Sequence, residues 1–315
     1  MAVIRKKMKK TLRIGTRDSE LALWQAKKVQ TLLENFGYTT YLVPVKSQGD
    51  LSLDIPLYEM GITGVFTKVL DVAMLQGSID IAVHSMKDVP TSLPKGIVKG
   101  AVLTRANVQD VLVYKDGLDF LSQEQATIAT GSLRRKAQWL RRYPTHQVEN
   151  LRGNIATRLH KLHEHSWYGA IFAAAALERL AQDHLQRLSL EWMTPAPAQG
   201  AILAVAMDSD PYTLEALSLI NDLKADTETQ IERRFLKRLE GGCTAPIGAK
   251  ATLKGDTLSF VGNLFSLDGK QAVEVRKSIP IHSIGSFPED CAQELLHSGG
   301  EGIMQEIRKV MNIQK

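Results

Sequence analysis

Short apolar segments alternate with amphipathic segments through the first two thirds of the chain, and this alternation constrains the possible fold more than any other feature. Residues 11–16 predict a buried strand that leads into a turn at Gly15, and residues 20–35 predict a helix that Asp18 and Ser19 can cap. Strands and helices alternating at this spacing are typical of mostly parallel sheets with helices on both faces. We therefore expect an α/β fold with doubly wound sheets. Further strands are predicted at 41–45, 79–83, 97–104, 111–114, 126–130, around Val148 and at 170–175, and further helices at 132–142 and 155–163.

The pattern changes near residue 224, where this alternation stops. A helix is predicted from Thr227 to Leu239, and Gly241 and Gly242 mark its end. The following segments alternate apolar and polar residues in a period of two, and the hairpin-type turns between them are typical of a small antiparallel sheet. We expect a third domain of the α+β class. Its predicted strands are 251–255, 257–265 and 272–279, and its final helix runs from Glu289 to Met311.

Proline and glycine mark irregular structure around the second strand. Pro44 has no backbone N–H to donate, so it predicts that the strand at 41–45 ends there or lies at a sheet edge. Residues 50–66 contain Pro56, Gly61 and Gly64 and show no clear period. They predict a long surface loop of the kind that often serves as a lid.

The basic charge of the chain lies in its first residues. Residues 1–10 contain only basic charges, and they account for the whole formal net charge of +5, so residues 11–315 are formally neutral. This favours a short solvated segment over a basic binding face, and we expect no nucleic-acid partner. The basic residues are Arg5, Lys6, Lys7, Lys9 and Lys10.

Hydropathy and cysteine usage indicate the compartment. No apolar run reaches the roughly 18 residues of a membrane span, and the N-terminal segment lacks the apolar stretch of a secretory signal. The two cysteines, Cys243 and Cys291, are far apart and show neither metal-type spacing nor a disulfide framework. We expect a cytoplasmic protein, with no membrane partner and no metal, in which Cys291 is a small buried apolar residue.

Arginines recur where predicted strands lead into helices. Arg17 follows the first strand, Arg134 and Arg135 begin the helix at 132–142, and Arg152 and Arg158 flank another junction. Ligands of doubly wound sheets bind outside the carboxyl ends of the strands, and guanidinium groups recognise carboxylates or phosphates there. Any one of these arginines is equally well explained as a solvated surface residue, but together they predict a polyanionic ligand. Small donors at the same ends are Ser19, Thr130, Gly131 and Ser132.

A polar segment, His84 to Asp88, follows the apolar strand at 79–83 and predicts a turn. Lys87 and Asp88 could act as an acid–base pair, or the Asp88 carboxylate could stabilise a nearby developing cation. A turn aspartate that caps the next segment explains the same pattern. His84 is better explained as a structural hydrogen-bonding residue than as a base.

Cys243 lies in the glycine-rich segment Glu240 to Pro246, between the predicted helix and the third-domain sheet. A cysteine there is accessible for reaction, and the glycines let backbone approach a ligand. No histidine partner is evident, so hydrolase chemistry is weakly supported. Covalent attachment of a group is one possibility among several.

Taken together, several segments in order resemble the porphobilinogen deaminase family over nearly the whole chain. The segments are IGTRDSELALWQA (14–26), DIAVHSMKDVP (80–90), ATGSLRRKAQ (129–138), LRGNIATRLHKL (151–162), PAPAQGAI (195–202) and LEGGCTAPIGA (239–249). The resemblance implies two doubly wound domains like those of periplasmic binding proteins and a small α+β C-terminal domain. The implied domains are 1–104 with 198–223, 105–197, and 224–315.

The resemblance also implies the reaction, that of a transferase in haem biosynthesis. Four porphobilinogen molecules lose ammonia in turn and condense onto a covalent dipyrromethane primer, and hydrolysis then releases hydroxymethylbilane. The implied cofactor, dipyrromethane, is attached by a thioether to Cys243, and the implied small-molecule partner is porphobilinogen. We expect a monomer.

The resemblance assigns roles to the charged and polar residues of these segments, because each pyrrole carries an acetate and a propionate. Asp88 would accept hydrogen bonds from pyrrole N–H groups and stabilise positive charge. The implied catalytic residues are Asp88, Arg17, Lys87 and Arg152; the implied cofactor-binding residues are Cys243, Lys87, Asp88, Thr130, Ser132, Arg134, Arg135 and Gly200; and the implied substrate-binding residues are Arg17, Ser19, Arg152, Arg158 and Gln199.

The chain departs from the family pattern mainly at small residues. Ala129, Ala176 and Ala198 stand where the family usually has glycine, Gly131 replaces a serine, and Thr63 stands where a lysine is usual. Alanine does not freely adopt positive φ, so turns that need it would be strained. These departures bear on rate and affinity rather than on the type of reaction.

Two functions of other classes compete with the enzyme. A non-enzymatic binder of small anions suits a two-domain architecture, but Cys243, the third domain and Asp88 argue against it. A nucleic-acid-binding protein is suggested only by the basic N-terminal segment.

Overall fold

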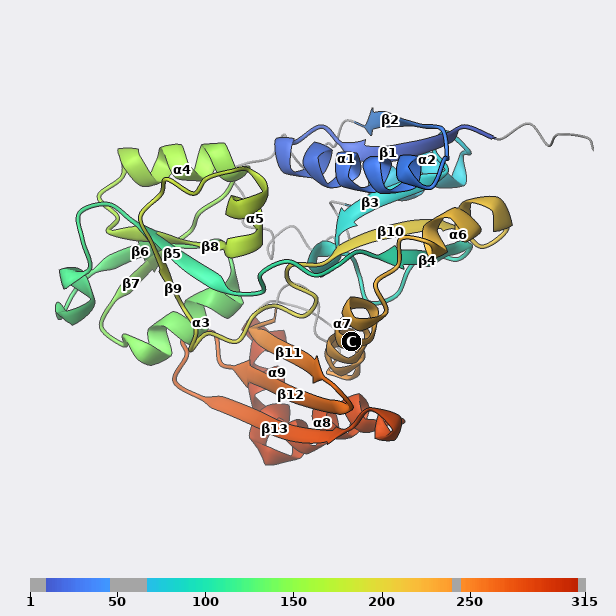
Figure 1. Ribbon diagram of the computed structural model, residues 1–315. Helices are drawn as coiled ribbons and strands as arrows, with labels where there is room; N and C mark the ends of the chain where they lie inside the picture. The colour runs from blue at the N-terminus through green and yellow to red at the C-terminus, as the bar shows by residue number, and fades with distance from the viewer. Residues whose placement is uncertain (1–9, 46–66, 240–244, 311–315) are drawn as a thin grey trace, which may run out of the picture.

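The computed structural model describes residues 10–45, 67–239 and 245–310, which form three sheets arranged as three lobes (Figure 1). The basic segment at 1–9, the predicted loop at 50–66, and Cys243 with its neighbouring glycines lie outside the described residues. In the part of the chain that the structure describes, no helix has the length and apolar character needed to span a membrane.

The first sheet has five strands in the order β2-β1-β3-β10-β4, and its neighbouring strands β2, β1 and β3 run parallel. β2 lies at the edge, which confirms the prediction from Pro44. Alternate residues of a strand point to opposite faces, so Ile81 and Val83 pack with α1 and α6, and Ala82 packs with α2. The elements are β1 (Leu12–Arg17), α1 (Glu20–Asn35), β2 (Thr40–Val45), α2 (Lys68–Leu75), β3 (Ile81–Ser85), β4 (Ile97–Val102), β10 (Ile202–Met207) and α6 (Pro211–Ser218).

The second sheet repeats this arrangement in the order β7-β6-β8-β5-β9. Ala170 and Phe172 of β8 pack toward α4 and α5 on one face, and Ile171 packs toward the buried Trp139 of α3 on the other. Each face therefore has its own apolar core. The elements are β5 (Asp110–Tyr114), β6 (Thr127–Ala129), α3 (Leu133–Arg142), β7 (Gln147–Glu149), α4 (Ile155–Glu164), β8 (Gly169–Ala173), α5 (Ala174–Arg179) and β9 (Arg187–Ser189).

Two connections join these sheets, from β4 to β5 and from β9 to β10, and each delivers an antiparallel strand. β10 is antiparallel to β3 and β4, and β5 is antiparallel to β8 and β9. The prediction of mostly parallel sheets is therefore wrong for these strands, and both sheets are mixed. A parallel neighbour needs a crossover that returns the chain to the same end of the sheet, and the connections between the sheets contain no such helix.

Two local predictions in the first sheet also need correction. The strand predicted at 79–83 instead runs from Ile81 to Ser85, so His84 lies in the strand, and residues 86–88 form a single 3-10 turn. Gly15 lies inside β1 rather than in a turn. A Cβ atom at Gly15 would lie 2.3 Å from the end of the Ile79 side chain, so any larger residue at this position would require Ile79 to move.

The third sheet is antiparallel, in the order β11-β12-β13, and its core packs against α7, α8 and α9. α7 begins earlier than predicted because the Asp222 side chain accepts a hydrogen bond from the Ala225 N–H and caps it. The predicted single final helix is broken near Gly299, whose φ is 108°. Cys291 is fully buried, as expected. The elements are α7 (Leu223–Arg238), β11 (Ile247–Lys254), β12 (Thr257–Phe265), β13 (Ala272–Pro280), α8 (Phe287–Leu295) and α9 (Glu301–Val310).

Candidate active site between the first two lobes

Charged residues from the first two sheets act on one another across the space between the lobes. Lys87 and Asp88 follow β3 at its carboxyl end, and Arg134 and Arg135 lie in the first turn of α3, after β6. Burial lowers the pKa of Lys87 to about 8; Asp88 opposes this shift and Arg135 adds to it. The structure therefore brings the predicted residues of the two sheets into one electrostatic cluster.

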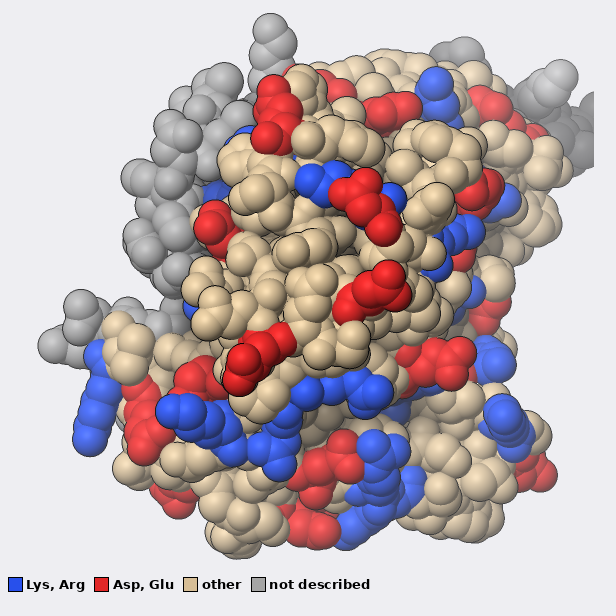
Figure 2. Space-filling view, turned by 90° about the vertical axis from the view of Figure 1, so that its left-hand side faces the viewer, with Lys and Arg blue, Asp and Glu red and all other residues tan. Residues whose placement is uncertain are grey.

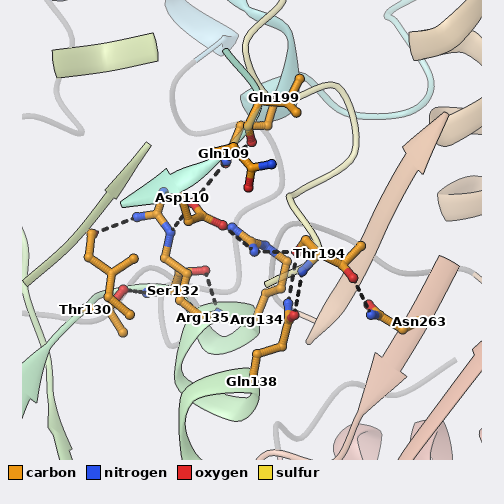
Figure 3. Close-up of polar contacts among 12 residues, drawn as sticks. Gln109, Asp110, Thr130, Ser132, Arg134, Arg135, Gln138, Thr194, Gln199 and Asn263 are labelled. Atoms are coloured by element: carbon orange, nitrogen blue, oxygen red, sulfur yellow. Dashed lines mark hydrogen bonds and ion pairs between the residues drawn. The ribbon is translucent and has the colours of Figure 1, made fainter. Parts of the chain in front are cut away.

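Asp110, the first residue of β5, holds both arginines of α3 (Figure 3). Arg134 Nη1 lies 2.7 Å from Asp110 Oδ2, and Arg135 Nε and Nη2 lie 2.9 and 2.8 Å from Asp110 Oδ1. All three side chains are at most 6% exposed. Burial alone would raise the pKa of Asp110, but Arg134 and Arg135 outweigh it and hold the pKa well below its ordinary value.

The backbone completes the environment of these arginines. Arg134 Nη1 also donates to the Thr194 carbonyl at 2.7 Å, and Arg135 Nη1 donates to the Ile171 carbonyl at 2.9 Å. Arg134 Nε is buried and has no hydrogen-bond partner among the described residues. The Gln138 side chain and the Thr194 backbone exchange two hydrogen bonds, at 2.9 and 2.8 Å. The start of α3 is thus fixed on several sides.

Gln199 and Gly200 lie on the second connection between the lobes. Gln199 is fully buried, and its Nε2 donates to the Val108 carbonyl and to Asp110 Oδ1, at 2.8 and 3.0 Å. Gly200 has a φ of 85°, and a Cβ there would lie 2.7 Å from the Ala106 carbonyl oxygen. Both residues therefore contact the first connection, Gln199 through a hydrogen bond and Gly200 through close packing.

The segment before α3 has the geometry of a capped helix start. Ser132 is the N-cap residue, and its hydroxyl accepts a hydrogen bond from the Arg135 N–H. The Thr130 hydroxyl accepts from the Ser132 N–H at 3.3 Å. Gly131, where the family usually has serine, approaches Leu151 so closely that a Cβ would lie 2.5 Å from the Leu151 carbonyl oxygen.

Arg152 and Arg158 belong to the segment between β7 and α4 and to α4 itself. Arg158 Nε donates to the Gly153 carbonyl at 2.7 Å, and burial lowers its pKa to about 10, with Arg135 adding to the shift and Asp88 opposing it. Arg152 is 8% exposed, and its Nη1 is buried without a hydrogen-bond partner among the described residues. Burial also lowers the pKa of Arg152.

Arg17 ends β1, and Ser19 is the N-cap residue of α1, although its side chain makes no capping hydrogen bond. Burial lowers the pKa of His84 to about 4, and Arg17 adds to this shift. His84 is therefore neutral at physiological pH, as expected for a structural residue rather than a base.

The donor set fits a group with several carboxylates. The carboxylates that interact with the cationic cluster include Asp88 and the fully buried Asp110, and the cluster also contains buried guanidinium nitrogens with no partner among the described residues. Guanidinium forks bind carboxylates through paired hydrogen bonds, so dipyrromethane, which carries acetate and propionate groups, matches these donors. The cationic cluster comprises Lys87, Arg134, Arg135, Arg152 and Arg158.

Sequence reasoning missed the residues that support this cluster. Asp110 was visible only as an acid at the start of an apolar strand, and its arginine partners come 24 and 25 residues later. Arg233 of α7 donates to the carbonyls of Met86, Val89 and Pro90, which bracket the turn that carries Asp88. No local sequence pattern predicts the contacts of Asp110 or of Arg233.

A hollow of about 730 Å³ lies elsewhere, between α1, α5, the first connection and the segment that joins α6 to α7. Arg179 stacks over Trp24 there, 5.7 Å from the ring centre, and donates to the Gly200 carbonyl. None of the predicted site residues lines this hollow.

Comparisons with known proteins agree with the resemblance. Residues 12–215 match the family described as porphobilinogen deaminase, dipyromethane cofactor binding domain, and residues 227–297 match porphobilinogen deaminase, C-terminal domain. A porphobilinogen deaminase of Syntrophotalea carbinolica is 41% identical over 298 residues, 93% of this chain and 95% of that protein. One of Carboxydothermus hydrogenoformans is 40% identical over 310 residues, 97% of this chain and all of that protein.

Similarity to solved structures is weaker. The periplasmic VFT2 domain of Bordetella pertussis BvgS is 12% identical with a TM-score of 0.42, covering 67% of this chain and 86% of that chain. This similarity is too low to add to the assignment. The two matched domains and the nearly full-length relatives decide it: the chain belongs to the porphobilinogen deaminase family.

Proposed function

We propose that this chain is a hydroxymethylbilane synthase that condenses four porphobilinogen molecules and releases the linear tetrapyrrole, with Asp88 at the reacting centre. The observation that carries the residue assignment is the cationic cluster, in which Lys87, Arg135 and Arg158 interact electrostatically with Asp88, although they come from two different sheets and their helices. Such a site suits a substrate that brings two carboxylates with every unit and develops positive charge when it reacts.

Dipyrromethane, held through Cys243, supplies when bound the free pyrrole position from which the chain is extended. Cys243 lies between the end of α7 at Arg238 and the start of β11 at Ile247. Arg134 and Arg135, together with Thr130, Ser132 and Gly200, are proposed to bind the cofactor carboxylates. The buried, partnerless guanidinium nitrogen of Arg134 supports this role.

The proposed substrate contacts come from Arg17, Ser19, Arg152, Arg158 and Gln199. Arg152 is supported most directly, because its Nη1 is buried without a partner among the described residues. Burial makes the positive charges of Arg152 and Arg158 unfavourable, as their lowered pKa values indicate. A substrate carboxylate that binds there would neutralise this positive charge. Gln199 is fully buried, so it would affect substrate binding indirectly, by holding the connection on which it lies in place.

Asp88 is proposed to accept a hydrogen bond from the pyrrole N–H of porphobilinogen. Its negative charge then stabilises the cation that develops on that ring as ammonia leaves, and again while a proton is lost after the new carbon–carbon bond forms. Lys87 and Arg17, with Arg152, would hold the carboxylates and assist departure of ammonia. The Arg233 contacts to the carbonyls around this turn keep Asp88 in place.

The remaining parts of the proposal concern organisation. Three separate sheets support a division into 1–104 with 198–223, 105–197, and 224–315. On the face shown in Figure 2, Lys and Arg are interspersed with Asp and Glu, which supports a small-molecule partner over a nucleic acid. We also propose that the protein is a monomer. A cytoplasmic location is proposed as well, and it is supported by the free, buried thiol of Cys291.

The experiment compares porphobilinogen turnover in the full-length chain with turnover in Asp88→Ala and Asp88→Asn. Both variants should lose most ammonia release, because neither provides a negative charge for the developing cation. Asp116→Asn, an exposed aspartate after β5, is the matched control and should be unaffected. Full activity in Asp88→Ala would refute the mechanism, and carboxylate binding without ammonia release in the unmodified chain would favour a non-enzymatic binder.

A further inference from the structure

Asp110 is inaccessible to ligands and yet lies at the centre of the arginine pair. Its side chain is 0% exposed, so no substrate carboxylate or bulk water reaches it. Its four donors come from Arg134, Arg135 and Gln199, that is, from α3 and from the second connection between the lobes. It is therefore a residue that acts through its neighbours.

The contacts of Asp110 fix how each guanidinium group is oriented. Arg135 is held by Asp110 through Nε and Nη2 and by the Ile171 carbonyl through Nη1, so its plane cannot turn without losing hydrogen bonds (Figure 3). Arg134 Nη1 bridges Asp110 and the Thr194 carbonyl, while its buried Nε has no hydrogen-bond partner among the described residues. A free arginine side chain samples many rotamers, and here that freedom is already lost before a ligand binds.

The connection that carries Gln199 holds Asp110 in turn. Gln199 Nε2 donates both to Asp110 Oδ1 and to the Val108 carbonyl, so one amide joins the two connections at the point where β5 begins. The Asp110 charge also opposes the effect of the arginines on Lys87, whose pKa burial lowers. The carboxylate thus reduces repulsion in the cluster as well as orienting it.

We infer that Asp110 is a positioning residue for the cofactor site: it holds the guanidinium groups of Arg134 and Arg135 in a fixed orientation, ready to bind ligand carboxylates, and Gln199 holds Asp110. This inference rests on the proposed function, because it assigns the arginines to the cofactor. Pre-orientation reduces the ordering cost of binding, and misplacement of a binding group by about 1 Å costs up to about 100-fold.

Asp110→Glu tests position without removing charge. The added methylene displaces the carboxylate by about 1.5 Å, so both arginines keep a counter-ion while their orientation changes. The measurement is the ratio of cofactor-loaded to unloaded full-length chain by intact mass, before and after incubation with porphobilinogen, together with the thermal unfolding midpoint. We expect at least about a tenfold lower ratio, with the chain still folded, and no change in the exposed control Asp116→Glu.

A double-variant comparison separates orientation from general stability. Arg135→Lys keeps the charge and removes the planar fork, so Asp110→Glu should lower the loading ratio much less in that background than in the unmodified chain. Loading of Asp110→Glu at the unmodified ratio, or an equal loss in both backgrounds, would overturn the inference. If Asp110→Glu fails to fold, Gln199→Met, which removes the amide donor and leaves the charges, takes its place with the same expected and overturning results. An unmodified chain that has its sequence mass both before and after incubation with porphobilinogen would instead refute the proposed function.

Discussion

Glu232 of α7 joins the third domain to both connections between the lobes, and replacing it with glutamine should destabilise the whole chain. Its carboxylate is fully buried and accepts hydrogen bonds from Arg105 Nη1 and Nη2, both at 2.8 Å. It also accepts from the Ala198 and Ala251 N–H groups, both at 2.7 Å. These donors lie on the first connection, the second connection and β11.

The expected magnitude follows from these contacts. In Glu232→Gln, one acceptor oxygen becomes an NH₂ donor that faces other donors, and Arg105 loses its main counter-charge. Breaking a buried ion pair in this way costs about 3–5 kcal/mol. Glu228 lies 3.7 Å from Arg105 Nη1 and partly compensates the charge, so we expect the lower end, about 3 kcal/mol.

Urea unfolding followed by far-ultraviolet circular dichroism measures this loss. The control is Glu306→Gln on α9, where the side chain is exposed and the substitution should change stability by less than about 0.5 kcal/mol. A loss in Glu232→Gln below about 1 kcal/mol would refute the view that this carboxylate fastens the connections to the third domain.

Three further predictions concern single groups. Burial lowers the pKa of Lys87 to about 8, so Lys87 loses the charge that binds a carboxylate as the pH rises through this value. The rate at which the unloaded chain gains mass in porphobilinogen should therefore fall over the same pH range. Lys87→Arg should remove this decline, and a decline that persists in the variant would contradict the role of Lys87. Burial would raise the pKa of Asp80, but hydrogen bonds from Arg13 and Lys10 lower it to about 2. The ionised carboxylate therefore contributes about 2 kcal/mol to stability above about pH 4, and this contribution is lost as the pH falls toward 2. In urea unfolding, the difference in stability between Asp80→Asn and the unmodified chain should shrink over this range, and a difference that does not change with pH would refute this role of Asp80. Ala198 has a φ of 61°, so Ala198→Gly relieves backbone strain but also removes a fully buried methyl group. The two effects oppose each other, and the free energy of unfolding should change by less than about 1 kcal/mol in the same assay; a larger loss would show that packing outweighs the strain.

The sequence predicts elements well where local pattern determines them. The strand at β1, the helix at α1, the edge position of β2 and the hairpins of the third sheet all follow from periodicity, capping and turn residues. The antiparallel entry of β5 and β10 does not, because their pairing depends on connections between distant parts of the chain. The pattern does not predict the break at Gly299, because a glycine inside an apolar helical pattern does not by itself end a helix.

The site shows the same division. Helix-start arginines and the Lys87–Asp88 turn are visible as residue types at strand ends, and the structure brings them together. Their supports are long-range: Asp110 and Glu232 find partners that only the folded chain supplies. Ala198 lies between these two cases. The glycine that is usual in the family at this position indicates that the backbone there can need a positive φ, and the structure gives Ala198 a φ of 61°.

Intact mass of the purified full-length chain tests the central claim most directly. The unmodified chain should carry the added mass of dipyrromethane, or acquire it on incubation with porphobilinogen. Cys243→Ser should carry none, whereas Cys291→Ser, at a buried thiol, should load normally. An unmodified chain that stays at its sequence mass in porphobilinogen, or added mass that persists in Cys243→Ser, would contradict the account.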